Sequence, residues 1–535
     1  MVTQSSVHTS GPAAPSTVPK SRRSLVSKGL AQFSGQALGL LLALVVAHLI
    51  ARRLGVGAEA DAFVMGRRLI TAVTETLHQI IGFVFMPMVA AQVIAGGTIW
   101  SILRKSAGPV FLAGGGLAVG LIAAAPVLVP LIAPGFDSTT RVLATQIMQI
   151  FALAVPFAVM TTVLSCFGNV HGAFGSLATI KQAPRLAVAL ALATLGNVAV
   201  NASWAFTIAS GAALLLTFAV TLQISRHSHT APKPKPAKPQ RAAHARRCVA
   251  AALLAVAALG FLWLETAIAA AHGTGGVAML DFGQRLGALL GNTLATALAA
   301  VVFADLSRRM ATADPDLDPA ALFQQALVIG LALVLVIACG VALNASALVE
   351  LLLGYGAFAT GADRAEIVAL IQMMGFAPVS ALVLRMMLMR IVADSDLPLV
   401  RLVGIAIGAD LLGRLVLFEL LVPRMGLTGI SLTLILSPVL PALLLLFLLR
   451  SRRIFQSRQF SLTPLRPLLA ASAFCALTLL PGALLVPQIL STADPKTQAL
   501  FQLGASGGAA LLVITLAARF LKIRPTLSSR PTSTA

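Results

Sequence analysis

Long apolar runs recur along the whole chain and limit what it can fold into. Only 11% of the 535 residues are charged, whereas 58% are hydrophobic. Apolar runs of about 18 residues or more predict membrane-spanning helices. Soluble domains carry about 25% charged residues, so the composition excludes a soluble enzyme, and it also excludes collagen-like, coiled-coil, disulfide-scaffold and disordered chains. We therefore expect an all-α polytopic membrane protein.

The apolar runs predict about fourteen transmembrane helices, because each run has the length that a bilayer core requires. A Pro/Lys-rich segment at 226–247 divides them into two sets. The predicted spans are 30–51, 62–94, 107–133, 143–168, 176–199, 203–225, 248–272, 279–306, 321–346, 364–391, 398–422, 427–449, 466–487 and 499–521.

Basic residues cluster in alternate gaps between these spans, which predicts that both chain termini are cytoplasmic. The segment at 226–247 is strongly basic, whereas 200–202 and 273–278 hold no Lys or Arg. We expect a basic N-terminal tail at 1–29, a first lobe at 30–225, an extended cytoplasmic linker at 226–247, a second lobe at 248–449, two extra helices within 450–522 and a C-terminal tail at 523–535.

The net charge of +21 could indicate a nucleic-acid partner, but its distribution does not. A nucleic-acid groove also calls for interleaved aromatic residues, and the chain has 3 Trp and 1 Tyr. Basic loops that face an anionic leaflet explain the charge. We expect membrane lipids, and no nucleic acid, as partners. The four cysteines stand singly in or beside apolar runs, so we interpret them as packing residues.

An internal repeat relates the two halves of the chain. Segments 130–164 and 350–384 resemble each other, and an even number of predicted helices separates them. The two copies then have the same orientation in the membrane, which predicts two parallel lobes of about six helices each, with two extra C-terminal helices. The matched pairs are Phe136 with Phe358, Arg141 with Arg364, Gln149 with Gln372, and Pro156 with Pro378.

Ionisable residues inside the first predicted lobe point to a hydrated cavity. Charged groups at membrane depth are costly, so they face protein, water or substrate rather than lipid. Span 62–94 carries Arg67, Arg68, Glu75 and His78, and Asp61 immediately precedes it. The spacing places Arg68, Glu75 and His78 on one helical face.

The second predicted lobe contains two carboxylate–arginine pairs at helical i, i+4 spacing. They are Asp281 with Arg285 and Asp410 with Arg414, and each is either a self-satisfied ion pair or part of a site. We interpret other arginines and a lysine near the predicted inner ends of spans as membrane anchors: Lys181, Arg185, Arg385 and Arg390. A surplus of arginine in a cavity favours a phosphate-bearing substrate.

Catalytic signatures are missing from the sequence. It contains no H-E-x-x-H, G-x-S-x-G or P-loop motif, so we predict no enzyme activity, no cofactor and no metal site. Two parallel lobes around a polar cavity are typical of an alternating-access transporter.

Several motifs resemble the MurJ/MviN lipid II flippases of the multidrug/oligosaccharidyl-lipid/polysaccharide exporter superfamily. They are ARRLGVGAEADAF (51–63), LIAPGFD (131–137), LDFGQRLGALLG (280–291), ADLSRR (304–309), GYGAF (354–358) and the stretch 396–432. The resemblance covers about residues 28–524 in consistent order. It implies fourteen helices, a central cationic cavity and flipping of an undecaprenyl-diphosphate-linked sugar by alternating access, coupled to an ion or to the membrane potential.

The resemblance also carries individual residues over. Asp61 matches the aspartate of a family D-A-F motif, Arg52 the arginine before a glycine turn, and Arg285 an arginine of the eighth helix. The sequence departs from the family pattern at single positions and along 69–82, which replaces a family L-P-N-L-L-R-R-x-F-A-E-G-A-F pattern. An Arg-Asp pair of the first helix falls at Val46 and Ala47, a functional arginine at Thr74 and an aspartate at Gln284.

We therefore expect a bacterial inner-membrane flippase for a lipid II-like saccharide. In this hypothesis the arginines bind the diphosphate, Asp61 pairs with an arginine at a gate, and the lipid tail lies between the lobes or along the extra helices. Alternatives are a flippase for another lipid-linked glycan, a cation-coupled drug exporter and a non-transporting envelope-assembly scaffold. The candidate substrate-binding residues are Arg285, Arg68, Arg67, Asp61, Arg52, Glu75 and Asp281.

Overall fold

The fold is that of a computed structural model, and all regular secondary structure in its described residues is helical. The structure describes residues 21–94, 99–171, 173–227, 241–295, 319–361, 364–393, 398–451, 484–489 and 493–520.

The first half of the chain forms the helices α1–α8. α4 begins with a polar N-cap: the carboxylate of Asp137 accepts a hydrogen bond from the backbone N–H of Thr139 at 3.2 Å. The bounds are α1 (Ser21–Arg53), α2 (Ala58–Ile94), α3 (Ile99–Ile132), α4 (Ser138–Ala152), α5 (Val155–Val170), α6 (Phe174–Ile180), α7 (Ala183–Thr194) and α8 (Val198–His227).

The second half continues as a similar series of helices, one of which contains a π-helical segment, η1. Residues 484–489 are also helical. The bounds are α9 (Arg241–Ala271), α10 (Gly276–Gly283), η1 (Gln284–Ala288), α12 (Pro319–Leu343), α13 (Ala345–Leu352), α14 (Gly356–Gly361), α15 (Arg364–Met374), α16 (Ala377–Ala393), α17 (Leu399–Met425), α18 (Leu427–Leu436), α19 (Val439–Ser451) and α21 (Pro495–Phe520).

The two copies of the internal repeat have the same local structure. One copy is α4 followed by α5, the other is α15 followed by α16, and each pair is separated by a two-residue break. The paired prolines, Pro156 and Pro378, stand in the first turn after the break. Proline is tolerated there because the first turn of a helix leaves its N–H groups without intrahelical partners.

Seven helical segments within the described residues are long and apolar enough to cross a membrane, so the chain is a multi-pass membrane protein. Exposed apolar side chains such as Leu112, Val127 and Ile208 cover the outside of these segments, as expected where lipid replaces water. Of the fourteen expected spans, much of 466–487 lies outside the described residues. The seven segments are Gly108–Ile132, Ser138–Val170, Val198–Arg226, Cys248–Ala271, Ala326–Leu343, Arg364–Leu388 and Leu427–Arg450.

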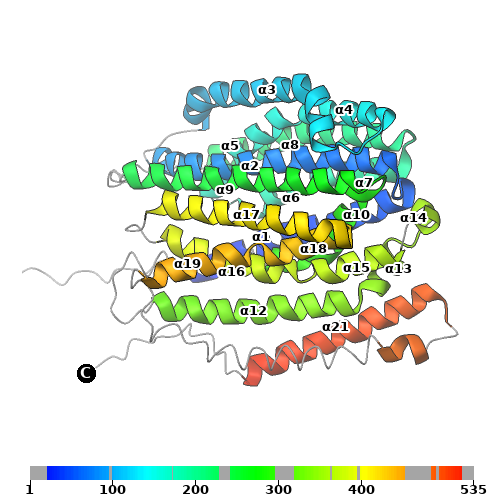
Figure 1. The fold of residues 1–535 in the computed structure, drawn as a ribbon. Helices are drawn as coiled ribbons and strands as arrows, with labels where there is room; N and C mark the ends of the chain where they lie inside the picture. The colour runs from blue at the N-terminus through cyan, green and yellow to red at the C-terminus, as the bar shows by residue number, and fades with distance from the viewer. Residues whose placement is uncertain are drawn as a thin grey trace, which may run out of the picture.

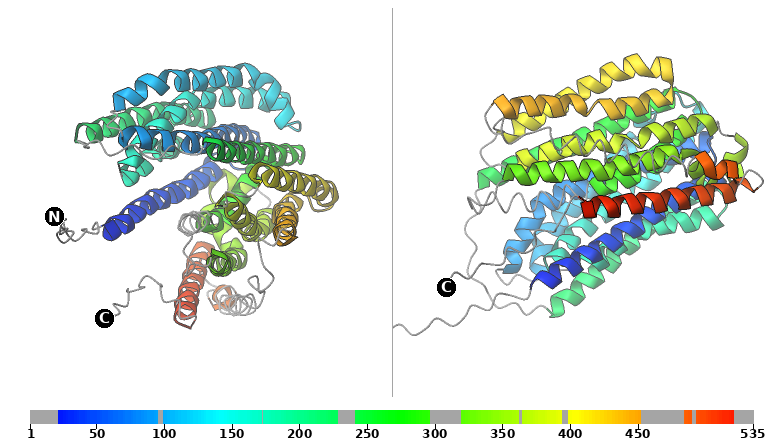
Figure 2. Two further views of the ribbon diagram at one scale, coloured as in Figure 1. Left: turned by 90° about the vertical axis from the view of Figure 1, so that its left-hand side faces the viewer. Right: turned by 90° about the horizontal axis from the view of Figure 1, so that it is seen from below.

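The helices form a bundle in which most axes run in a similar direction (Figures 1 and 2). In Figure 1 α3, α4, α5, α8 and α2 of the first half lie in the upper part, with α9 of the second half just below α2. α1 is seen lower, at the level of α17 and α18, while α12 lies below these and α21 lies at the lower edge. The halves meet along a seam where α2 packs against α9 and α10, and α1 packs against α14 and η1. One continuous apolar core crosses this seam and includes the buried rings of Phe63, Phe151, Phe282 and Phe358.

Four loops bring the two halves together at one end of the bundle, at the right of Figure 1. We call this end, with loops 54–57, 133–137, 272–275 and 353–355, the glycine end. A Cβ on Gly135 would overlap the carbonyl oxygen of Ala270, and a Cβ on Gly356 would overlap that of Arg52. Gly356 also has a φ of 55°, which side chains disfavour. Backbone therefore meets backbone across the seam, and the glycine end is closed.

Several expected spans are divided or shifted: 176–199 forms α6 and α7, and α8 already begins at Val198. Two helices also begin in segments that were expected to be non-helical. α1 begins at Ser21, within the expected N-terminal tail, and α9 begins at Arg241, within the segment expected to be an extended linker. The helices therefore continue past the last apolar residues, as spans do when charged side chains at their ends reach the interface. The remaining parts of the tails and the linker, at 1–20, 228–240 and 521–535, lie outside the described residues.

Candidate functional site

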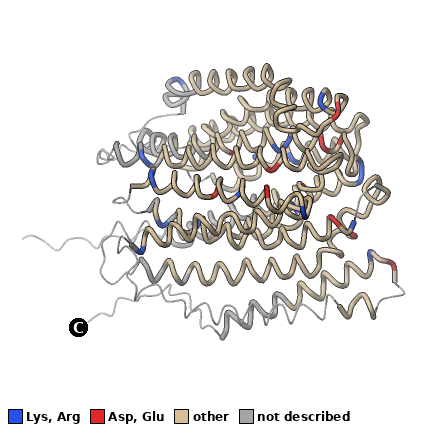
Figure 3. The backbone as a smooth tube through the Cα atoms, in the orientation of Figure 1, with Lys and Arg blue, Asp and Glu red and all other residues tan. Residues whose placement is uncertain are grey.

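A polar cavity of about 310 Å³ lies on the seam between the two halves. Three guanidinium groups and a single carboxylate face it, a surplus of two positive charges. Charged residues otherwise gather near helix ends, with one cluster inside the bundle (Figure 3). The lining residues are Ala43, Val46, Arg67, Thr71, Arg185, Val188, Phe206, Asp281, Gln284, Arg285, Leu289 and Asn292.

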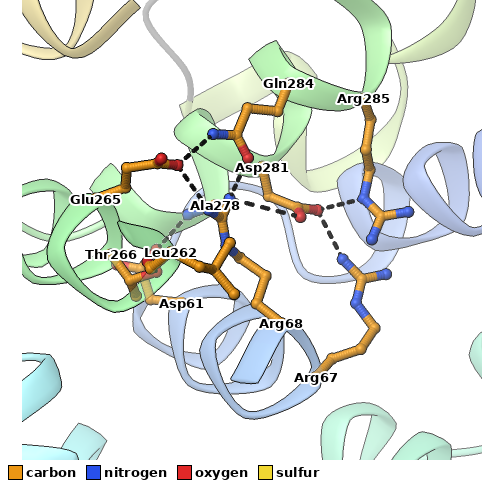
Figure 4. A network of polar contacts seen from close by, with 10 residues as sticks. All are labelled: Asp61, Arg67, Arg68, Leu262, Glu265, Thr266, Ala278, Asp281, Gln284 and Arg285. Atoms are coloured by element: carbon orange, nitrogen blue, oxygen red, sulfur yellow. Dashed lines mark hydrogen bonds and ion pairs between the residues drawn. The ribbon is translucent and has the colours of Figure 1, made fainter. Parts of the chain in front are cut away.

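Asp281 is the carboxylate of the cavity wall, and it contacts both Arg67 and Arg285 (Figure 4). Its Oδ2 accepts from Nη2 of Arg67 at 2.6 Å and from Nε of Arg285 at 2.6 Å. Arg67 belongs to α2, whereas Asp281 and Arg285 belong to α10 and η1, so the contact joins the two halves. The side chains of Arg67 and Asp281 are 7% and 5% exposed. In so little water a charge-assisted contact is strong.

Arg285 stands in the π-helical segment η1, directly after α10. A π-helix inserts one extra residue into a turn, and such insertions are frequent at functional sites. Arg67 and Arg285 each lie nine residues beyond the starts of their helices, Ala58 and Gly276. The two arginines therefore reach a similar depth from opposite sides of the seam.

Arg68 faces away from the cavity into a second layer of the same network. Its Nη1 donates to Oε1 of Gln284 at 2.7 Å, and its Nη2 lies 3.7 Å from Oε2 of Glu265. Glu265 also accepts from Nε2 of Gln284 at 3.0 Å and from Nη1 of Arg414 at 2.6 Å. The network thus runs from α2 through α9 and η1 to α17.

The predicted pair of Asp410 and Arg414 forms, with Nε of Arg414 3.3 Å from Oδ2 of Asp410. Both side chains are buried, at 8% and 11% exposure. The pair is not isolated, because Arg414 also holds Glu265. The pair is the part of the network that lies on α17, and it does not line the cavity.

A second polar group surrounds Arg185 in the first half. Nη1 of Arg185 donates to Gln182, and Arg185 forms no ion pair within the part of the chain that the structure describes. Glu75, an exposed residue of α2, is close enough to both Arg185 and Lys181 to stabilise their charges. Arg185 was expected to anchor a helix end, and the structure places it in the cavity instead.

His78 contacts Lys181 beside this group, at 3.1 Å between Nε2 and Nζ. Nδ1 of His78 lies 3.0 Å from the hydroxyl of Thr162, which itself donates to the carbonyl of Ala158 at 2.9 Å. The hydroxyl must then accept from Nδ1–H, and Nε2 accepts from the ammonium group of Lys181. His78 is therefore neutral here, with its proton on Nδ1.

Asp61 does not pair with an arginine, contrary to expectation. Its carboxylate accepts from the backbone N–H groups of Gly275 at 2.6 Å and Ala278 at 2.7 Å. The first turn of a helix leaves these donors without intrahelical partners. Asp61 of α2 thus caps α10, across the seam at the glycine end.

The remaining predicted site residues lie outside the cavity. Arg52 is exposed at the end of α1, where its backbone meets Gly356. Glu75 does not line the cavity. Of the seven candidates, the cavity wall contains three: Arg67, Asp281 and Arg285.

Two residues of the site, Glu265 in the polar network and Arg185 in the cavity wall, were not among the candidates predicted from the sequence. Glu265 is a lone carboxylate within an apolar run, and its isolation at membrane depth was a usable signal. Arg185 has no such signal, because an arginine near the end of a short apolar run also fits an anchor. Within the described residues no group of three or more His, Cys, Asp or Glu is arranged to hold a metal ion.

Comparisons with known proteins agree with this architecture. No curated protein sequence matches the chain. The chain resembles the solved structure of lipid II flippase MurJ in an inward closed conformation, with a TM-score of 0.69 and 14% identity over 92% of this chain and 100% of that one. It also resembles an inward-facing multidrug resistance MATE family transporter of the MOP superfamily, with a TM-score of 0.65 and 14% identity over 79% and 98% of the two chains.

A third solved structure is a MOP superfamily transporter from Pyrococcus furiosus whose binding pocket is described as having reverse polarity, with a TM-score of 0.58 and 14% identity over 80% and 94% of the two chains. At these identities the likenesses establish the fold alone. The family is established by sequence, since the family profile described as lipid II flippase MurJ matches residues 50–489. The chain therefore belongs to the MurJ lipid II flippase family.

Proposed function

We propose that this protein moves a polyprenyl-diphosphate-linked saccharide, of the lipid II type, from the inner to the outer leaflet of a bacterial inner membrane. The observation that carries the proposal is the cavity with three arginines and one carboxylate. A diphosphate diester carries about two negative charges, which matches the surplus, and guanidinium groups bind phosphate oxygens in pairs.

The transport step is alternating access between two parallel six-helix lobes of a fourteen-helix bundle. The closed glycine end is the outer end in this proposal, because the most basic gap, 226–247, belongs to the opposite end and basic loops stay inside. Both termini are then cytoplasmic. Closure through Asp61, Gly135 and Gly356 holds the cavity shut on the outer side until the lobes rock apart.

The lipid tail would lie in an apolar groove on the last helices. A groove of about 610 Å³ lies between 484–489 and α21, and its walls are almost wholly apolar. Burial of each CH₂ group there would contribute about 0.8 kcal/mol. The lining residues are Val486, Ile489, Leu500, Phe501, Gly504 and Ala505.

A second candidate substrate is another lipid-linked glycan, and one observation favours it. Two of the departures from the family pattern, Val46 and Gln284, line the cavity itself. The charge balance argues against a cation-coupled drug exporter, because a cationic drug calls for surplus carboxylates. Membrane potential or a coupling ion would drive the cycle.

Transport in proteoliposomes tests the proposal. Arg67→Gln, Arg185→Gln and Arg285→Gln should each lower flipping of a fluorescent polyprenyl-diphosphate saccharide about tenfold or more, since each removes a charge-assisted hydrogen bond. Arg424→Gln is the matched control, because its guanidinium is exposed and donates to a carbonyl of its own helix. Unchanged flipping in all three cavity variants would refute the proposal.

Complementation then identifies the glycan. Rescue of a strain depleted of its lipid II flippase supports lipid II. Failure to rescue with normal expression, together with flipping of another polyprenyl-linked glycan in vitro, assigns that glycan instead. A protein that flips neither refutes the proposal and favours the scaffold alternative.

A further inference from the structure

Two guanidinium groups, one from each half of the chain, converge on the carboxylate of Asp281. One carboxylate oxygen, Oδ2, lies between Arg67 and Arg285 at 2.6 Å from each. The other, Oδ1, lies 4.0 Å from Nη1 of Arg68. An anion held by guanidinium groups from two directions is the arrangement expected for a bound phosphoryl group. Here an internal carboxylate provides that anion.

The carboxylates of this network all belong to the second half of the chain, whereas its arginines come from both halves. Asp281 has Arg285 four residues away on its own helix, and Glu265 has Arg414 in the same half. If the halves separate, both carboxylates keep an arginine partner. Arg67 and Arg68, in contrast, form no ion pair with a carboxylate of the first half within the described residues.

Separation of the halves would therefore leave two adjacent buried guanidinium groups without a counter-ion. The side chains of Arg67 and Arg68 are 7% and 5% exposed, and a buried charge without a counter-ion is strongly unfavourable. Nε of Arg67 and Nε of Arg68 already lack hydrogen-bond partners among the described atoms. Nε of Arg67, which lines the cavity, can serve an incoming anion.

The cavity gives such an anion access to the same place. Arg67, Asp281 and Arg285 all line it, and Arg185 adds a further charge from the first half. A dianion that enters can replace the single negative charge of Asp281 on Arg67. The arginines of the first half then keep a counter-ion while the seam opens.

We propose that Asp281 is a built-in surrogate for the substrate's phosphate: it holds Arg67 across the seam when the cavity is empty, and the substrate's anionic group displaces it and so permits the halves to separate. This rests on the function proposed above. Asp281 is a positioning residue in this scheme, and its carboxylate competes with the substrate. Opening is thereby tied to an occupied cavity.

The scheme predicts an unusual response to Asp281→Asn. The probe is a polyprenyl diphosphate in detergent micelles, with the matching polyprenyl alcohol as the uncharged control. Loss of the competing carboxylate should tighten binding of the diphosphate about tenfold, the effect of one charge-assisted hydrogen bond. In proteoliposomes KM and turnover should both fall, because no carboxylate then competes with the bound substrate for the arginines and the substrate is released more slowly.

Asp410→Asn is the matched control. Asp410 is also buried and also pairs with an arginine four residues later, but it does not line the cavity. Its variant should leave the affinity for the diphosphate unchanged. Equal tightening in both variants would overturn the proposal, because it would report a general loss of negative charge rather than displacement.

A distance measurement on the otherwise native protein keeps the test independent of how well Asp281→Asn folds. Spin labels at the exposed positions Thr194 and Thr360, in a cysteine-free background, report the separation of the halves at the glycine end. The diphosphate, and not the alcohol, should lengthen this distance. Without ligand, a fraction of the Asp281→Asn molecules should already show the longer distance.

The outcomes separate the two proposals. If the diphosphate does not bind the unmodified protein, the proposed function falls and this inference falls with it. If the diphosphate binds but Asp281→Asn binds it no more tightly, or the distance does not respond to it, the function stands and the surrogate role of Asp281 is refuted.

Discussion

The carboxylate of Asp61 in α2 accepts hydrogen bonds from the N–H groups of Gly275 and Ala278, at the start of α10 in the other half of the chain. Asp61 is 1% exposed. A helix cap usually comes from the residue just before the helix, but here it comes from a segment more than 200 positions earlier. The cap of α10 is therefore also a connection between the halves.

Asp61→Ala should weaken closure of the glycine end. Loss of an N-cap costs about 1 kcal/mol, and the free N–H groups add to this because they are buried. The distance between labels at Thr194 and Thr360 should broaden toward longer values. Glu59→Gln is the control. Glu59 accepts a hydrogen bond from the N–H of Ala199 at 3.3 Å, and both residues belong to the first half, so this variant should leave the distance between the labels unchanged.

Gly356→Ala should disturb the same end by a different route. Its φ of 55° costs a residue with a Cβ about 1–2 kcal/mol, and that Cβ would overlap the carbonyl oxygen of Arg52. We expect lower thermal stability and a more open glycine end. Gly116→Ala in α3 has no atom within 4 Å of the new Cβ, so it should leave both measurements unchanged. Equal effects of the two changes would contradict backbone contact at the seam.

Arg414→Met should be among the most destabilising single changes in the chain. It leaves Glu265 and Asp410 as buried carboxylates without their closest cation, at a cost of about 3 kcal/mol. The thermal midpoint in detergent measures this. Glu265→Gln together with Arg414→Met should recover much of the loss, because the unpaired charge on residue 265 is removed. If the double variant loses more stability than the two single variants lose together, the contact is not an ion pair.

The N-cap of α4 should be sensitive to acid. Hydrogen bonds from Thr139 and Thr140 lower the pKa of the exposed Asp137 to about 2. The folded pKa lies below the unfolded value, so the ionised cap stabilises the protein above about pH 4 and this stabilisation disappears as the pH falls through 2. The difference in thermal stability between the protein and Asp137→Ala should therefore be constant near neutral pH and shrink below pH 4. A difference that does not change with pH would exclude the ionised cap.

Much of the fold could be predicted from the sequence because its signals are local. Apolar runs of spanning length become helices, and the paired prolines at 156 and 378 mark equivalent breaks in both halves. The pairs Asp281–Arg285 and Asp410–Arg414 could also be predicted, since residues four apart on a helix are neighbours. The surplus of arginine at membrane depth indicated an anion.

The arrangement of the site was decided by tertiary structure. Arg67 and Asp281 are 214 positions apart, and nothing in either segment specifies that their side chains meet. The same holds for Asp61 as a cap of α10, for Arg185 in the cavity wall and for Glu265 between two arginines. Hydropathy fixes which segments enter the membrane, because it depends on each residue's own transfer free energy. Which charges compensate one another depends on how the helices pack: the buried guanidinium groups of Arg67 and Arg68 require carboxylate partners, and within the described residues these come from the other half, across the seam.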